Sequence, residues 1–428
     1  MKNITKNQKL AAIKDTTLII AIDIGAYNHH ARAFDWRGSE QQKKAFKFSN
    51  CRSGFESFLK WMEDIQSKKK FKDVMVGLEP TGHYWFPLCD YLMDRKLRVV
   101  ITSPVSVKQT KEAATSSASK SDTQDPIAIA HVMISGNYQN VYRPKGNHAK
   151  LRKAYTVRDS VMEQHKASIN RIHAWVSTYF PEWRKVYSSI KAVSLLMLLR
   201  QAPLPTDIVK LGVDGIVEYW REYKLYLARE RAERLVEEAK RSIGVTEDAE
   251  IARIEIQILL EDYDRHAAHL AMLDKKLAEL VEKYPGGEKL MQIPGVSLQI
   301  AAGFLAEVGD IDRFPGAPQL QSYAGLDILQ KSSGKQKGQS RISGRGRHKL
   351  RRVMFMAALS VVSHAPEFRA VQEYYKHRKK NPLKPIQALI AVACKLLRVF
   401  YAMLVKGVDY DPSKITCGGK APAVEQTA

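Results

Sequence analysis

The chain has few cysteines, and those it has are scattered. Cys51, Cys89, Cys394 and Cys417 are the whole complement in 428 residues, and no two of them have the spacing of paired metal ligands. This pattern argues against a disulfide framework or a zinc site and favours reduced thiols. Residues 1–16 are polar and rich in lysine without an apolar core, so we expect no secretory signal.

Two further absences limit the possible partners. No apolar stretch approaches membrane-spanning length and no basic amphipathic anchor stands out, so we expect no membrane partner. Acidic residues are also scarce: 45 stand against 68 lysines and arginines, which gives a formal net charge of +23. Such a charge favours a polyanion, with nucleic acid ahead of an anionic membrane surface.

The length allows two or three domains with full cores, and the pattern along the chain changes twice. The basic N-terminal tail is followed by residues 17–142, which are predicted to form apolar strands and helices. Three meandering strands come first, and helices and strands then alternate. That is the order of a ribonuclease-H-like domain. A generic α/β domain is the alternative. The fold class is therefore α/β followed by α.

Residues 143–285 are helical and rich in charge. Apolar residues recur there at three–four spacing, from Ile251, Ile254 and Ile258 to Leu270, Leu273, Leu277 and Leu280, after a plausible N-cap at Thr246. The stripe predicts either a coiled coil that dimerises the chain or a helical bundle within one chain, and the two are about equally supported. The turn at 284–287 ends this region.

Residues 286–410 are predicted to form a mostly helical domain, and residues 411–428 a disordered tail. Near the start of that domain, a Pro-Gly-Val turn at residues 294–296 precedes an apolar helix. It resembles a helix-hairpin-helix, whose backbone N–H groups can hold a phosphate, although a purely structural turn explains it nearly as well. The apolar segment 386–405 near the end is expected to be a core helix.

Four carboxylates stand at the ends of apolar runs in the first domain. Asp23 and Glu79 each follow a predicted buried strand, and Asp122 and Asp125 lie three residues apart, on one face of a predicted helix. Acids at the ends of buried strands cost desolvation energy unless they are compensated, usually by a divalent metal. Polar loops at strand ends are the plainer explanation.

A second segment is basic throughout. No acidic residue occurs between Ile328 and Pro366, and glycines interrupt the run. A run of one sign is poor at pairing with itself and good at following phosphates, and glycine lets backbone amides approach a polyanion. The predicted nucleic-acid contacts are Lys331, Lys335, Lys337, Arg341, Arg345, Arg347, Lys349, Arg351 and Arg352. Ser332 and Ser333 lie within this run, and spacing alone does not distinguish a nucleophile from a loop serine there.

Together these motifs resemble the insertion-sequence 110/1111 transposase family, which includes Piv-type DNA invertases. The matching segments include Ala21–Gly25, Gly77–Gly82, Lys120–Asp125, Ile293–Val296, Tyr323–Leu326 and the run from Ser333 to Gly346. No single motif is specific, but their order along nearly the whole chain is.

The resemblance implies a serine recombinase with a RuvC-like domain. In it Asp23, Glu79, Asp122 and Asp125 would bind Mg²⁺ or Mn²⁺, and Ser333 would form a covalent phosphoserine link to DNA, with Ser332 left open as the alternative. It also implies donor and target DNA as substrates, a structured bridge RNA as guide, and a homo-oligomer, dimer or tetramer. One subunit's RuvC-like domain would meet another's serine domain. Such a protein is expected in the cytoplasm with the nucleoid.

Three other functions remain open from the sequence. A RuvC-like nuclease would cut DNA with metal-activated water and use the second domain only as a clamp. A non-catalytic nucleic-acid-binding factor would need none of the carboxylates. An actin-like phosphotransferase is disfavoured, because no second glycine-rich phosphate loop accompanies the Asp-Ile-Gly motif at residues 23–25.

Overall fold

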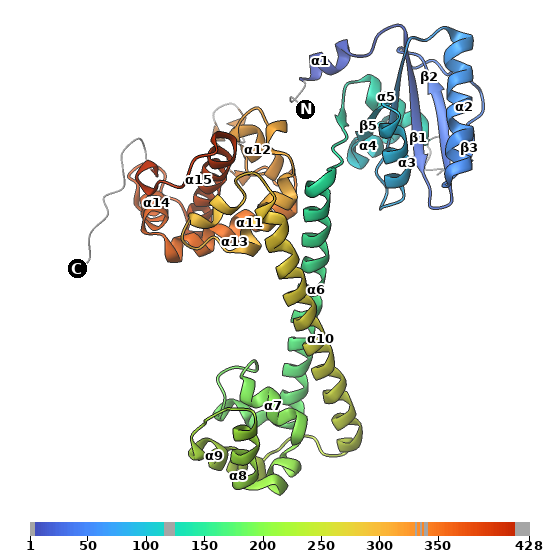
Figure 1. Cartoon of the computed structure of the whole chain (residues 1–428). Helices are drawn as coiled ribbons and strands as arrows, with labels where there is room; N and C mark the ends of the chain where they lie inside the picture. Colours follow the sequence, from blue (N-terminus) through green and yellow to red (C-terminus); the bar gives the residue numbers. More distant parts are fainter. Residues whose placement is uncertain (1–4, 115–124, 330–331, 334–335, 338–340, 416–428) are drawn as a thin grey trace. The chain divides into compact units, whose positions relative to one another are not determined.

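The computed structural model describes residues 5–114, 125–329, 332–333, 336–337 and 341–415, and it divides into two units, 1–144 and 145–428, which we describe separately (Figure 1). The predicted tail therefore lies largely outside the described residues. The elements of unit 1 are α1 Lys6–Ala11, β1 Thr17–Ile24, β2 Asn28–Phe34, β3 Phe46–Ser49, α2 Arg52–Lys69, β4 Asp73–Leu78, α3 Trp85–Asp94, β5 Arg98–Thr102, α4 Pro104–Ala114, α5 Asp125–Ile134 and β6 Tyr138–Asn140.

Unit 1 is built on a six-stranded sheet with the order β3-β2-β1-β4-β5-β6. The first three strands pair antiparallel, β1, β4 and β5 pair parallel, and β6 adds antiparallel at the far edge. This topology confirms the predicted mixed α/β domain with three meandering strands. The predicted strands and the first two predicted helices recur within a few residues of the expected positions.

The two faces of this sheet carry different helices, because successive residues of a strand point to opposite sides. Ile20, Ile22 and Leu78 belong to the core formed with α2 and α3. Ile19 and Ala21 belong instead to the core formed with α5. Because β1 is buried on both faces, its sequence reads as a continuous apolar run.

Unit 2 is almost entirely helical. Its elements are α6 Gly146–Tyr179, η1 Pro181–Lys185, α7 Val193–Gln201, α8 Pro205–Glu222, α9 Arg229–Lys240, α10 Ala249–Glu282, η2 Glu288–Gln292, α11 Leu298–Val308, η3 Ile311–Arg313, α12 Ala317–Ala324, β7 Ile328–Leu329, β8 Ser332–Ser333, β9 Gln336–Lys337, β10 Arg341–Ile342, α13 His348–His364, α14 Pro366–His377, α15 Pro385–Lys406 and η4 Pro412–Lys414.

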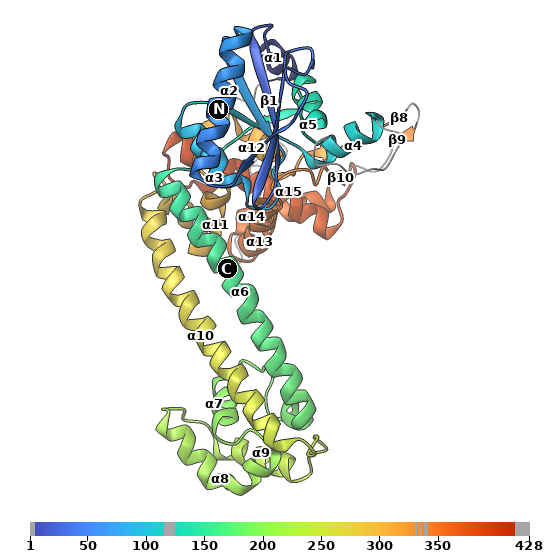
Figure 2. The same cartoon turned by 90° about the vertical axis from the view of Figure 1, so that its right-hand side faces the viewer.

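The long helices α6 and α10 lie side by side in both views and form a hairpin (Figures 1 and 2). At one end of the hairpin, α7, α8 and α9 pack into a lobe with a hydrophobic cluster of its own, which includes Trp175, Leu198 and Trp220. At the other end, α11 to α15 form a second lobe around a separate cluster. The predicted helical region is therefore a hairpin that carries a small globular lobe.

The apolar stripe of α10 is divided between these environments. Leu270, Leu277 and Leu280 are buried within the chain, whereas the Ile251, Ile254 and Ile258 side chains are 65%, 50% and 54% exposed. The leucines thus follow the prediction of an intramolecular bundle, and the isoleucines leave an apolar face uncovered. The predicted N-cap at Thr246 is wrong, because α10 begins at Ala249 with Asp248 at the cap position.

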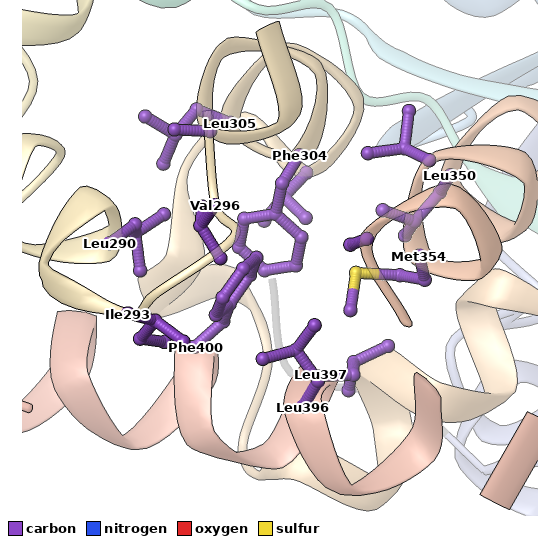
Figure 3. Packing of buried hydrophobic residues seen from close by; sticks show 14 of the residues in the cluster. Leu290, Ile293, Val296, Phe304, Leu305, Leu350, Met354, Leu396, Leu397 and Phe400 are labelled. Carbon is purple, nitrogen blue, oxygen red and sulfur yellow. The ribbon is translucent and has the colours of Figure 1, made fainter. Parts of the chain in front are cut away.

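The C-terminal lobe is held by a core between α11, α13 and α15, in which Phe304, Met354, Leu396 and Phe400 are completely buried (Figure 3). Helix α15 has 22 residues and is apolar enough to cross a membrane by length and composition. The sequence-based statement that no apolar stretch approaches spanning length is therefore wrong. Burial of one face of α15 in this core agrees with the predicted core helix and explains its apolar composition.

The Pro294–Gly295 turn is not a helix-hairpin-helix of two α-helices. It joins the short η2 to α11, and Gly295 lies against α13: a Cβ atom there would be 2.9 Å from the Ser360 carbonyl oxygen. Gly295 also has φ of +92°, which a residue with a side chain rarely adopts. The glycine is required for packing against protein, so the expected approach of this turn to a phosphate has no support.

Candidate active site

The first two carboxylates lie at the ends of neighbouring parallel strands. Ile22 of β1 pairs with Leu78 of β4; Asp23 follows Ile22 within β1, and Glu79 comes directly after the end of β4. Because Ile22 and Leu78 face α2 and α3, the strand alternation directs Asp23 and Glu79 to the face covered by α5. Both residues are half-buried. The register therefore brings the two side chains to one edge and one face of the sheet.

Helix α5 adds a third carboxylate, Asp125, which is the first of its described residues. The helix packs closely on the sheet because β4 has Gly77 beneath it. A Cβ atom at this glycine would lie 2.1 Å from the Met133 sulfur. Asp122 lies outside the described residues, so its predicted place on the same helix face stays a prediction.

These carboxylates influence one another electrostatically. Burial raises the pKa of Glu79 above its usual range, and the negative charge of Asp125 raises it further, whereas Lys111 opposes the shift. Lys111, on α4, forms an ion pair with Asp125 at 2.6 Å between Nζ and Oδ1. The site thus gathers negative charge under partial desolvation, and Lys111 is the counter-charge of Asp125.

The residues fit a hard divalent cation by their chemistry. Asp23, Glu79 and Asp125 offer carboxylate oxygens, which Mg²⁺ and Mn²⁺ prefer. The raised pKa of Glu79 marks a position where a cation would be favourable. Within the described part of the chain, however, no group of three acidic, histidine or cysteine side chains is close enough to hold a metal ion. Binding would require Lys111 to leave Asp125, or Asp122 to contribute.

Three residues near this site were missed by the sequence reasoning. Lys111 is one, and no local pattern distinguishes it. The others are His30 and Lys47: His30 lies opposite Asp23 on β2, and Lys47 lies opposite His30 on β3. Alternation of apolar and polar residues along 28–34 could have placed His30 on the polar face, but not beside Asp23.

The predicted serine lies in a small β structure of unit 2. The β7 strand pairs antiparallel with β10, with Ile328 opposite Ile342, and β8 pairs with β9, with Ser333 opposite Gln336. Of the predicted nucleic-acid contacts, Lys331 and Lys335 lie outside the described residues, and Lys337 and Arg341 are described by their backbone only, as are Ser332 and Ser333.

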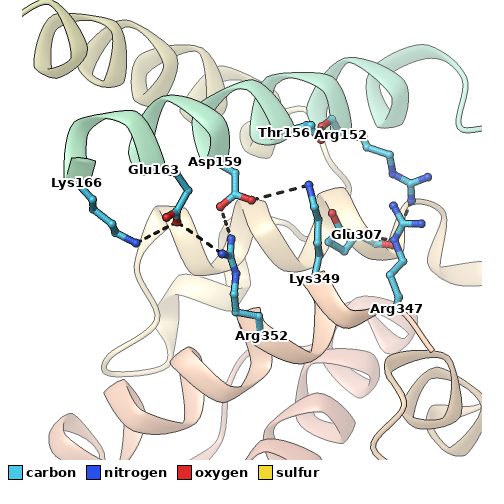
Figure 4. A network of polar contacts seen from close by, with 9 residues as sticks. All are labelled: Arg152, Thr156, Asp159, Glu163, Lys166, Glu307, Arg347, Lys349 and Arg352. Atoms are coloured by element: carbon cyan, nitrogen blue, oxygen red, sulfur yellow. Dashed lines mark hydrogen bonds and ion pairs between the residues drawn. The ribbon is translucent and has the colours of Figure 1, made fainter. Parts of the chain in front are cut away.

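The remaining basic residues of this run mostly have partners within the chain, and their predicted contacts to phosphates stay a prediction. Arg352 pairs with Asp159 of α6 and lies 3.8 Å from Glu163, while Lys349 lies 3.8 Å from Asp159 (Figure 4). The basic run contains no acidic residue, and the acidic partners of Arg352, Asp159 and Glu163, lie on α6. These contacts join α13 to α6 of the helical hairpin.

Arg347 and Arg351 have internal partners as well. Arg347, the N-cap residue of α13, pairs with Glu307 of α11, a carboxylate whose side chain is only 1% exposed (Figure 4). Arg351 donates to the carbonyl oxygens of Ala324 at 3.0 Å and Gly344 at 3.2 Å. Arg345 differs from these: it is exposed, and no side-chain partner is recorded for it among the described residues.

The glycines of the run also serve packing. A Cβ atom on Gly346 would lie 2.6 Å from the Tyr323 carbonyl oxygen, and one on Gly325 would lie 2.4 Å from the Arg351 guanidinium. Gly344 has φ of +64° and open space around it, so its conformation but not its packing calls for glycine. Gly325 and Gly346 are therefore required by close packing, whereas Gly344 is required by its backbone conformation.

Two models of protein families match the chain. One, described as a transposase of the DEDD type in IS110 elements, matches residues 20–181, which include Asp23, Glu79, Asp122 and Asp125. The other, described as the transposase IS116/IS110/IS902 family, matches residues 287–375, which include the serines and the basic run. The lobe formed by α7 to α9 lies between the two matched ranges.

Individual relatives are similar at low identity. The chain is 26% identical over 243 residues to the insertion element IS110 uncharacterized 43.6 kDa protein of Streptomyces coelicolor, covering 56% of this chain and 59% of that protein. It is 23% identical over 320 residues to the insertion element IS116 uncharacterized 44.8 kDa protein of Streptomyces clavuligerus, covering 72% and 75%. It is 29% identical over 168 residues to the pilin gene-inverting protein of Moraxella bovis, covering 38% and 52%.

Proposed function

Because two models of transposase families match residues 20–181 and 287–375 in that order, we propose that the chain is a transposase of the IS116/IS110/IS902 family. We propose that it cuts and rejoins DNA as the recombinase of an insertion sequence. The observation that carries the proposal is the arrangement of carboxylates in unit 1. Asp23 lies near the end of β1 and Glu79 directly follows the parallel strand β4, both on the face covered by α5, and Asp125 is the first described residue of that helix.

We assign Asp23, Glu79, Asp122 and Asp125 as the ligands of Mg²⁺ or Mn²⁺. A domain of the DEDD type implies use of a divalent metal, and the carboxylate oxygens suit either ion. When bound, such an ion polarises a phosphate and neutralises charge that develops on its oxygens. Gly77 keeps α5 close to the sheet, and Lys111 holds Asp125 until a cation replaces it.

We assign Ser333 as the nucleophile. Its Oγ would attack a DNA phosphorus, the bond from phosphorus to the leaving DNA oxygen would break, and that oxygen would gain the proton that the serine loses. One phosphodiester replaces another, so the strand can be rejoined by the reverse reaction without ATP. Support comes from the place of Ser333 inside the matched transposase range.

The partners follow from the same assignment. Donor and target DNA would be the substrates, and a structured bridge RNA is a proposal that rests on family resemblance. We further propose a homo-oligomer, dimer or tetramer. The exposed face of Ile251, Ile254 and Ile258 on α10 supports it, because an apolar stripe at three–four spacing is the seam that coiled coils bury.

A metal-dependent nuclease that uses water is the second candidate, since the same carboxylates would serve it. Replacing Asp23 by Asn and Glu79 by Gln tests both enzymatic functions. With the full-length protein and a plasmid carrying the DNA that flanks its gene, we expect loss of metal-dependent strand cleavage by at least about a hundredfold. Cleavage at the unchanged rate would refute the assignment, while a DNA-binding role alone would survive.

A further inference from the structure

A lateral row of polar residues crosses the sheet of unit 1 beside the carboxylates. Lys47 on β3 pairs with His30 on β2, and His30 pairs with Asp23 on β1. Residues directly opposite each other in antiparallel strands point to the same side of a sheet. The three side chains therefore stand in one line on one face.

That face is the one that carries the candidate active site. Along β2, Ala31 and Ala33 lie in the core with α2 and α3, and Phe34 lies in the core with α5. By alternation His30 shares the α5 face with Phe34. On β3, Phe48 faces α2, so its neighbour Lys47 points the other way. The strand pattern and the pairing thus agree.

The outer end of the row is cationic and open. β3 is the edge strand, Lys47 is exposed, and Lys43 and Lys44 are exposed in the loop just before it. No ion pair of Lys47 is recorded in the described part of the chain. By contrast, Arg32, on the same face of β2, is already held by Glu40 at 2.8 Å. The edge therefore offers hydrogen-bond donors and positive charge that the described acids do not neutralise.

We propose that Lys47 and His30 form a phosphate subsite that holds the DNA strand next to the phosphate being cut. The proposal rests on the recombinase function stated above and adds a path for the DNA strand over the β3 edge. Neighbouring strands lie about 4.8 Å apart, so Lys47 is roughly 10 Å from Asp23 across the sheet. That separation suits a neighbouring phosphate better than a direct ion pair with the carboxylate. Lys47 supplies charge, and the imidazole of His30 supplies a directional donor.

The alternative is a structural role, in which Lys47 and His30 only offset the repulsion among the carboxylates. The salt dependence of DNA binding separates the two roles. Each phosphate neutralised by a lysine contributes about 0.9 to the slope of log affinity against log salt, and a lysine that never meets DNA contributes nothing.

The experiment measures binding of the full-length protein to a fluorescein-labelled random-sequence DNA duplex in EDTA, by fluorescence anisotropy, from about 50 to 200 mM salt. We expect Lys47→Gln to lower the slope by about 0.9, and His30→Ala to weaken binding about threefold to tenfold with little change in slope. The matched control is Lys60→Gln, which removes an exposed lysine from α2 on the opposite face and should leave both quantities unchanged.

An unchanged slope in folded Lys47→Gln protein, with unchanged affinity in His30→Ala, would overturn the subsite. Equal effects from Lys60→Gln would overturn it as well, because they would reflect net charge alone. Strand cleavage by Asp23→Asn protein, measured separately, reports on the recombinase function. Persistent cleavage there would refute that function whatever the binding data say, so the two failures are distinguishable.

Discussion

At the scale of single residues, His29 is a titratable group buried in the core of unit 1. It is completely buried beside Phe48 and Phe55, and neither ring nitrogen has a hydrogen-bond partner of good geometry among the described residues. Burial lowers its pKa below the ordinary histidine value, an effect that Asn50 partly opposes. Because the folded state favours the neutral ring, protonation favours unfolding.

The direction of this pKa shift predicts how the stability of the protein depends on pH. The stability that neutral His29 allows is fully present above the unfolded pKa of about 6.5 and is lost as the pH falls below it toward the depressed folded value. We expect His29→Phe to reduce the loss of stability between about pH 7.5 and 5.5, measured by urea unfolding. His131→Gln, at an exposed position on α5, should retain the wild-type pH dependence. Parallel pH profiles for wild type and His29→Phe would contradict the account.

The buried acid Glu307 makes a second residue-scale prediction. Replacing Arg347 by Met leaves that carboxylate without its ionic partner, and removing one partner of a buried pair is costly. Because the Arg347 side chain is 35% exposed, we expect a loss of about 2–3 kcal/mol rather than the full buried value, seen as a lower urea midpoint. Arg345→Met, two residues away, should change the midpoint little. Equal effects of the two substitutions would show that Glu307 does not depend on Arg347.

At the scale of elements, the close packing of α5 on β4 positions the candidate site. Gly77→Ala places a methyl group within 2.1 Å of the Met133 sulfur atom and should push the helix outward. We expect destabilisation of about 1–3 kcal/mol together with reduced metal-dependent cleavage. Adding Met133→Ala should restore part of both, so the two changes should be non-additive in a double-mutant cycle. Strictly additive effects would argue against this contact.

Some helices and strands were predictable from the sequence, whereas the contacts between them were not. The apolar runs before Asp23 and Glu79 and the helix at 53–67 were predictable, because burial and periodicity are local signals. The helix that carries Asp125 was predictable as well, and α5 includes this residue. The partners of the basic run were not predictable: Asp159 is 193 residues from Arg352 in sequence, and only the α6–α13 contact brings them together. The contacts of Arg352 within the chain therefore depend on tertiary structure and leave no local signal in the sequence.

At the scale of the whole molecule, the chain carries two matched family regions and a lobe between them. The lobe of α7 to α9 has its own hydrophobic cluster, distinct from that of the C-terminal lobe. Residues 182–286 fall outside both family models. The helical hairpin thus joins the second matched region to a lobe that the family models do not include.

The exposed isoleucines of α10 make the prediction at this scale. If they form the proposed seam between subunits, Ile254→Glu with Ile258→Glu should convert the oligomer to a monomer, measured by light scattering after gel filtration. Val193→Glu, an equally exposed apolar position on α7, is the matched control and should leave the mass unchanged. An unchanged mass of the double variant would remove α10 from the subunit interface.

The central claim is that Ser333, in the basic run of unit 2, breaks the DNA strand by covalent attack. The most direct measurement is mass spectrometry of the full-length protein after reaction with plasmid carrying the DNA that flanks its gene, denaturation, and digestion with nuclease and trypsin. The account predicts a nucleotide joined through phosphate to Ser333 of the peptide Ser332–Lys335, present in Ser332→Ala protein and absent from Ser333→Ala protein. Cleaved DNA without any adduct, and undiminished cleavage by Ser333→Ala protein, would contradict it and favour hydrolysis by water.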